Sequence, residues 1–109
     1  MAVTIANVAH VIRGNERVRY VDITGPASYT TNGEALTAAN IAALTDGDGW
    51  TISNILKFDA EVPVTGQSLS LDRTNSKIKY YNGTTEIAAA VNLSTVVTRC
   101  EVTYAPSNY

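Results

Sequence analysis

Apolar side chains recur at every second position through most of this chain, and this period constrains its fold more than any other feature. From Ile52 to Val62 the even positions carry Ile52, Asn54, Leu56, Phe58, Ala60 and Val62, and the odd positions from Lys57 on carry Lys57, Asp59 and Glu61. The same alternation marks Leu69 and Leu71, Ile78 and Tyr80, and the run from Val96 to Tyr104 that holds Cys100. Successive side chains of a strand point to opposite faces, so the pattern predicts half-buried β-strands.

Turn residues separate these runs. Asn82-Gly83 between Tyr81 and Thr84 predicts a tight hairpin, because a type I′ turn needs positive φ at both central residues. Gly14-Asn15 and Thr74-Asn75 predict two further hairpins. Short strands separated by turns at roughly ten-residue spacing indicate an all-β chain. We therefore expect one domain, residues 1–109, folded as an antiparallel, jelly-roll-like β-sandwich.

One helix is expected near residues 37–44. Thr37 can cap an alanine-rich run in which Ile41 and Leu44 lie three residues apart, with Leu36 as a neighbour on the core side. A loop of Asp and Gly residues at 45–49 ends the helix. Two turns of helix are too short to be stable alone, so the sheets must hold it in place.

The first twelve residues do not keep one apolar face. Apolar side chains occupy both odd and even positions there, namely Val3, Ile5, Val8, Val11 and Ile12. Three interpretations remain open: both faces are buried, a β-bulge shifts the register, or residues 1–12 form an extended arm that docks on a neighbouring subunit. A similar shift within residues 17–23 predicts a bulge near Tyr20.

Composition and charge exclude several classes of protein. The net charge of -2 argues against a nucleic-acid partner, which normally requires a basic surface. No apolar run approaches the ~18 residues that span a bilayer, and the N-terminus lacks the pattern of a signal peptide. A single cysteine allows no intrachain disulfide. We expect a chain made in a reducing cytoplasm, without a membrane partner.

Few residues could support chemistry. The chain has one histidine, His10, and one cysteine, Cys100, and nothing in the sequence brings them together. Asp46-Gly47-Asp48-Gly49 lacks the remaining ligand positions of a calcium loop, and a zinc site would need an unusual ligand set. We expect no enzyme, no cofactor and no metal site.

The segment Tyr29-Thr30-Thr31-Asn32-Gly33-Glu34-Ala35-Leu36-Thr37 is the most distinctive motif. It resembles a signature of small virion structural proteins of tailed bacteriophages, the family of capsid decoration or cement proteins. The hairpin region 77–87 and Asn92-Leu93-Ser94 resemble the second half of such proteins. The resemblance implies a small β-sandwich that sits on the capsid surface in symmetric copies and performs no chemistry.

The motif itself has two interpretations. Gly33 permits a backbone conformation that other residues resist, and Glu34 can favour the N-terminal end of the following helix. The residues Tyr29, Gly33, Glu34, Leu36 and Thr37 could therefore define a corner between a strand and the helix, or they could form a contact site. We favour the corner.

The resemblance implies two partners, the major capsid protein and the chain itself as a homo-dimer or homo-trimer, in a virion assembled in the host cytoplasm. Our candidate interface residues are Val3, Ile5, Val8, Tyr81 and Tyr109. Two alternatives remain open: another virion role, in head-tail joining or in the tail, and a carbohydrate- or receptor-binding module. The second would need an exposed aromatic platform, for which Tyr81 is the candidate.

Overall fold

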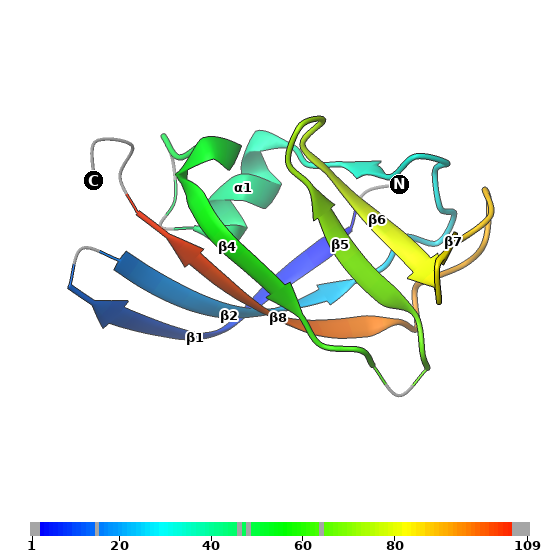
Figure 1. The fold of residues 1–109 in the computed structure, drawn as a ribbon, viewed down its shortest axis with the longest axis horizontal. Coiled ribbons are helices and arrows are strands. Elements are labelled where there is room, and N and C mark those ends of the chain that lie inside the picture. The colour runs from blue at the N-terminus through cyan, green and yellow to red at the C-terminus, as the bar shows by residue number, and fades with distance from the viewer. Residues whose placement is uncertain (1–2, 15, 46, 48, 64, 106–109) are drawn as a thin grey trace.

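Two antiparallel sheets and one short helix make up the fold of the computed structural model (Figure 1), which describes residues 3–14, 16–45, 47, 49–63 and 65–105. The first sheet has the order β1-β2-β8-β4, with β1 at Thr4–Arg13, β2 at Glu16–Thr24, β8 at Val97–Tyr104 and β4 at Ile55–Ala60. The second has the order β3-β6-β5, with β3 at Glu34–Ala35, β6 at Lys77–Asn82 and β5 at Ser68–Asp72; β7, at Thr85–Glu86, pairs with β6. The prediction of an all-β, sandwich-like fold is confirmed.

The core lies between the two sheets. From β8 the alternate residues Thr98, Cys100, Val102 and Tyr104 are fully buried, and from β6 so are Ile78 and Tyr80. Arg99, on the other face of β8, is exposed, as the alternation predicts. Two edge-to-face aromatic contacts tie distant segments together: Tyr29 on Tyr80, and Trp50 on Tyr104.

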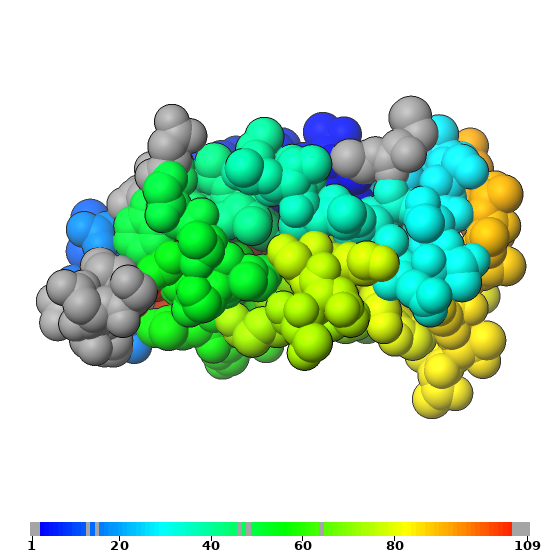
Figure 2. All heavy atoms as spheres, turned by 90° about the horizontal axis from the view of Figure 1, so that it is seen from above, coloured from blue at the N-terminus to red at the C-terminus, as the bar shows by residue number. Residues whose placement is uncertain are grey.

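The helix α1 (Ala38–Leu44) begins where the sequence predicts. Thr37 is its N-cap: the Thr37 hydroxyl accepts a hydrogen bond from the Asn40 backbone N–H, and the Asn40 side chain accepts one from the Thr37 N–H. Leu44 is fully buried and Ile41 packs against the core, so the helix is held by its apolar side. The space-filling view shows α1 beside the hairpin of β5 and β6 (Figure 2). Within the described part of the chain, no helix has the length and apolar character that crossing a membrane requires.

The segment 52–62 is less regular than its alternation predicts. Ile52–Asn54 form a 3₁₀ turn, and the pairing of β4 with β8 shifts between Ile55 and Lys57. This irregularity buries Ile55 and leaves Leu56 46% exposed. Val62 lies beyond the end of β4 and is also exposed. The expectation that Leu56 and Val62 face the core is wrong. The register shift turns Ile55 inward in place of Leu56, and Val62 is exposed because the strand has already ended at Ala60.

The hairpins form where the turn residues predict, with one difference of register. Asn82 pairs with Thr85 at the end of the β6–β7 hairpin, so the turn is centred on Gly83-Thr84 and not on Asn82-Gly83. Gly83 has φ 67°, whereas Thr84 is not among the residues with positive φ, which fits a type II′ turn. The β1–β2 hairpin closes with residue 13 opposite Glu16.

The N-terminal segment belongs to the first sheet. Thr4–Arg13 pair with β2 along their length, with a register shift between Asn7 and Ala9 that leaves Val8 unpaired. Of the three interpretations, the bulge is the one that the structure contains, and residues 4–12 are not an extended arm. The bulge expected near Tyr20 in β2 is in fact in β1, opposite Tyr20 and Val21.

Candidate binding surfaces

The motif at residues 29–37 forms a buried corner. The Tyr29 hydroxyl donates a hydrogen bond to Glu86 Oε2 at 2.7 Å and accepts one from the Tyr80 backbone N–H at 3.2 Å. Burial, together with the Glu86 carboxylate, raises the pKa of Tyr29 well above its usual value, so the hydroxyl keeps its proton. The same Glu86 oxygen accepts a hydrogen bond from the Asn32 N–H at 2.8 Å. Tyr29 therefore joins the corner to both β6 and β7.

Gly33 and Glu34 complete the corner. Gly33 has φ 111°, and a Cβ there would lie 2.9 Å from the Ile78 carbonyl oxygen, so only glycine fits against β6. Glu34 is 3% exposed, and its carboxylate accepts a hydrogen bond from the Thr30 N–H at 2.6 Å. The expectation that Glu34 serves the helix N-terminus is wrong; Thr37 and Asn40 do that. These contacts, with the burial of Leu36, agree with the corner interpretation.

The candidate interface residues lie in different environments. Val3 is 4% exposed within the core and Ile5 packs against that core, so both side chains are occupied within this chain, which corrects their assignment to an interface. Val8, at the bulge of β1, is 46% exposed and fits the expectation of an accessible side chain. Tyr81 is expected to be exposed, but it is half-buried in β6, where it pairs with Ser68 of β5 and Glu86 of β7, so its ring is not fully open to solvent. Tyr109 lies outside the described residues.

The two residues considered for catalysis are apart. His10 lies in β1 opposite Arg19, and its Nε2 is 3.1 Å from the Tyr104 hydroxyl. Cys100 lies in β8 opposite Val21, and burial raises the pKa of its thiol to about 12. Among the residues that the structure describes, no three His, Cys, Asp or Glu side chains are placed to hold a metal ion. Asp46 and Asp48 of the considered calcium loop lie outside that part.

A hollow of about 250 Å³ lies on the outer face of the first sheet, between β2, β8 and β4. Three of its charged side chains, Arg99, Asp59 and Glu101, are engaged with neighbouring side chains. Arg99 forms an ion pair with Asp22, and the Tyr20 hydroxyl donates a hydrogen bond to Glu101 Oε2 at 2.8 Å. The Asp22 carboxylate raises the pKa of the Arg99 guanidinium further. Mutual pairing of this kind is typical of a solvated strand face.

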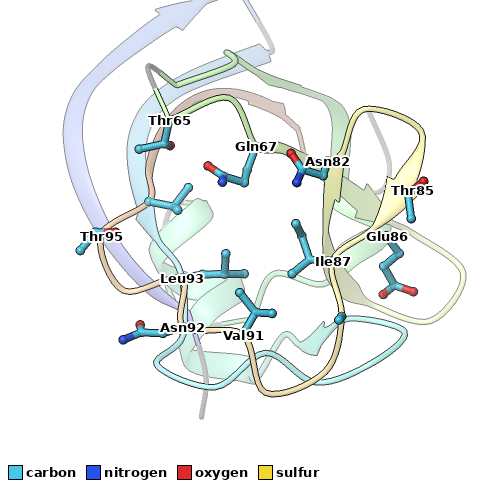
Figure 3. Close-up of a pocket in the computed structure, with 12 residues that line it drawn as sticks. Thr65, Gln67, Asn82, Thr85, Glu86, Ile87, Val91, Asn92, Leu93 and Thr95 are labelled. Carbon is cyan, nitrogen blue, oxygen red and sulfur yellow. The ribbon is translucent and has the colours of Figure 1, made fainter.

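A larger groove, of about 680 Å³, opens where β6 and β7 meet the segment 87–96 (Figure 3). Ile87, Leu93 and Val91 form an apolar side, and Gln67 and Asn82 face them from across the hollow (Figure 3). Glu86, the charged residue of the lining, points away from the centre, and its carboxylate is held by Tyr29 and Asn32. The groove is therefore uncharged toward its centre and partly apolar.

One polar atom of the groove is unsatisfied. Gln67 Oε1 is buried and has no hydrogen-bond partner among the described residues. A buried acceptor without a donor is costly, and because the oxygen has almost no accessible surface, a ligand in the groove does not reach it in this conformation. No sequence pattern predicts the groove, because its lining comes from several segments between residues 65 and 96 with no common periodicity.

The fold and the groove together define a small β-sandwich-like domain with a neutral, solvent-open surface groove. Comparison of the chain with protein-family models, with curated proteins and with solved structures finds no match.

Proposed function

We propose that this chain is a structural protein of a tailed-bacteriophage virion. It acts as a capsid decoration or cement protein that binds the shell of major capsid protein as a homo-oligomer. The resemblance at residues 29–37 supports the proposal, since those residues form a buried corner of the kind that characterises a fold rather than a catalytic site. The observation that carries the binding role is the neutral groove.

The groove suits a segment of protein better than a charged metabolite. Its centre has no charged side chain with which to hold a phosphate or carboxylate, and its apolar side is formed by Ile87, Val91 and Leu93. An extended peptide has an uncharged backbone and can carry apolar side chains, which suits a neutral and partly apolar lining. We propose that a loop of the coat protein occupies the groove. Symmetric copies on the shell would then multiply many individually weak contacts.

A direct test is electron cryo-microscopy of particles from the phage that encodes the chain. Density for this domain on the outer shell, with the groove against a coat subunit, is the expected result. Density at the neck or the tail would move the proposal to the alternative of head-tail joining or a tail protein. Absence of the chain from purified virions would refute both.

The groove is tested by binding of purified protein to shells that lack it, measured by co-sedimentation. Val91→Glu places a charge in the apolar side of the groove at a residue that is 40% exposed, so the core is spared. Binding should fall at least about tenfold, because burial of an unpaired carboxylate is costly. Val62→Glu is the control, since Val62 is 65% exposed and does not line the groove. Equal binding by both variants would show that the groove is not the contact.

A further inference from the structure

The two edge strands of the first sheet differ in how well they are protected against pairing with a strand of another chain. The edge strand β4 carries Lys57 and Asp59, which form an ion pair at 3.1 Å. Beside it, Arg73 Nη1 donates hydrogen bonds to the Ile52 and Ile55 carbonyl oxygens. Charged side chains and occupied backbone groups are the usual means by which proteins prevent an edge strand from pairing with another chain.

The opposite edge, β1, lacks these features. β1 is 10 residues long, and from Thr4 to Ile12 it contains no Lys, Arg, Asp or Glu. β2 is the only strand with which it pairs in the described part of the chain. Three aliphatic side chains of this edge strand are accessible, with exposures of 46% for Val8, 43% for Val11 and 64% for Ile12.

The bulge at Val8 divides β1 and leaves a regular second half. Residues 9 to 13 pair with β2 without interruption, from Ala9 opposite Tyr20 to residue 13 opposite Glu16. Along this half, alternate residues direct their backbone N–H and C=O groups to the outer side of the sheet. A partner for these backbone groups must itself be an extended strand. Because residues 9–12 of β1 carry no Lys, Arg, Asp or Glu, β1 of a second copy can pair with them without repulsion between like charges.

We infer that residues 9–13 of two copies pair antiparallel, around a two-fold axis near Val11, to form a dimer with one continuous eight-stranded sheet. Residues 9 to 12 carry no formal charge at pH 7, so the centre of the pairing brings no like charges together. The contact is isologous and closed, and it produces a dimer rather than a trimer. The inference builds on the proposed function only in the expectation that the chain acts as a homo-oligomer.

The test is light scattering after size exclusion, and sedimentation equilibrium, over about 1 µM to 1 mM protein. The expected mass at high concentration is twice the 11.6 kDa of the chain. Val11→Lys sets two ammonium groups opposite each other at the axis, and should raise the dimer dissociation constant at least about tenfold. Ile12→Lys, at a more exposed position, should weaken the dimer as well.

Val97→Lys is the matched control, because Val97 is also a strand valine, 47% exposed, but lies in β8 away from the β1 edge. The protein with Val97→Lys should have the same dimer dissociation constant as the unchanged protein. Hydrogen exchange should show concentration-dependent protection at residues 9–13. A monomer at every concentration, a trimer, or equal weakening by Val97→Lys would overturn the inference.

The two proposals fail separately. A protein that stays monomeric and still binds shells would overturn the dimer and leave the shell-binding function standing. A protein that dimerises but binds no shell would overturn the shell-binding function and leave the dimer standing. Pairing of β1 with a strand of the coat protein would appear as protection of residues 9–13 on shells but not in free protein, and would also overturn the self-pairing.

Discussion

Removal of one oxygen atom should test whether the corner at Tyr29 stabilises this fold. The Tyr29 side chain is 2% exposed, and its hydroxyl bridges Glu86 Oε2, at 2.7 Å, and the Tyr80 backbone N–H, at 3.2 Å. Tyr29→Phe removes both hydrogen bonds. The ring itself is kept, with its edge-to-face contact on Tyr80. The change therefore isolates the polar contribution of the corner.

The expected loss follows from the two partners. A hydrogen bond to a charged group contributes roughly 1.5–3 kcal/mol, and a buried N–H left without an acceptor costs roughly 1–3 kcal/mol. Glu86 is half-buried and keeps its bond from the Asn32 N–H, which offsets part of the loss. We expect the free energy of unfolding to fall by about 2–4 kcal/mol. At about 4 °C or more per kcal/mol, the melting temperature should drop by at least about 8 °C.

Urea unfolding followed by the fluorescence of Trp50 measures this loss, provided that the slope with denaturant is unchanged. Tyr20→Phe is the matched control. The Tyr20 hydroxyl also donates to a glutamate, Glu101, at 2.8 Å, but on the half-exposed outer face of the first sheet. Its loss should cost less than about 1 kcal/mol. A loss below about 0.5 kcal/mol for Tyr29→Phe, or equal losses for both variants, would refute the reasoning.

Three further predictions concern the fold. Gly33→Ala should cost at least about 2 kcal/mol in urea unfolding, because φ is 111° and the new Cβ meets the Ile78 carbonyl oxygen; Gly66→Ala, at φ 91° in open space, should cost clearly less. Cys100 should resist iodoacetamide at pH 8 until the protein unfolds. Stability should fall above about pH 9, by up to ~1.4 kcal/mol per pH unit, because the unfolded thiol loses its proton while the buried one, with its pKa raised to about 12, keeps it; Cys100→Ala should reduce this slope. Deletion of residues 1–12 should abolish cooperative thermal unfolding in circular dichroism, because it removes β1 from the sheet; an unchanged melting temperature would contradict this.

A strand that keeps one register against a neighbour was predictable from alternation. Along β8, pairing with β2 keeps one register from Val97 to Tyr104, so every second residue from Thr98 onward faces the core. The helix was equally predictable from the sequence, because its N-terminal cap is formed by Thr37 and Asn40, which are close in sequence and need no tertiary contact to interact.

Positions governed by long-range contacts were not predictable. Leu56 is exposed because β4 shifts its register against a strand more than forty residues later in the sequence. Glu34 precedes the helix in sequence, yet the corner directs its carboxylate to the Thr30 N–H. The groove has no sequence pattern at all, because the end of β6, β7 and the segment 87–96 come together only in the folded chain. Where a local pattern and a tertiary contact compete, the tertiary contact decides.

The groove and the edge of β1 occupy different parts of the molecule, and this separation bears on both proposals. The groove is lined by residues between 65 and 96, whereas the regular half of β1 runs to the far end of the first sheet, at the β1–β2 turn (Figure 1). No residue belongs to both surfaces. A dimer formed through β1 would therefore leave both grooves open, one on each copy. A dimer that makes two weak contacts with the shell would bind it with an avidity well above the affinity of either contact alone. Val11→Lys should then weaken shell binding without touching the groove, and Val91→Glu should weaken shell binding at least about tenfold while leaving the dimer intact.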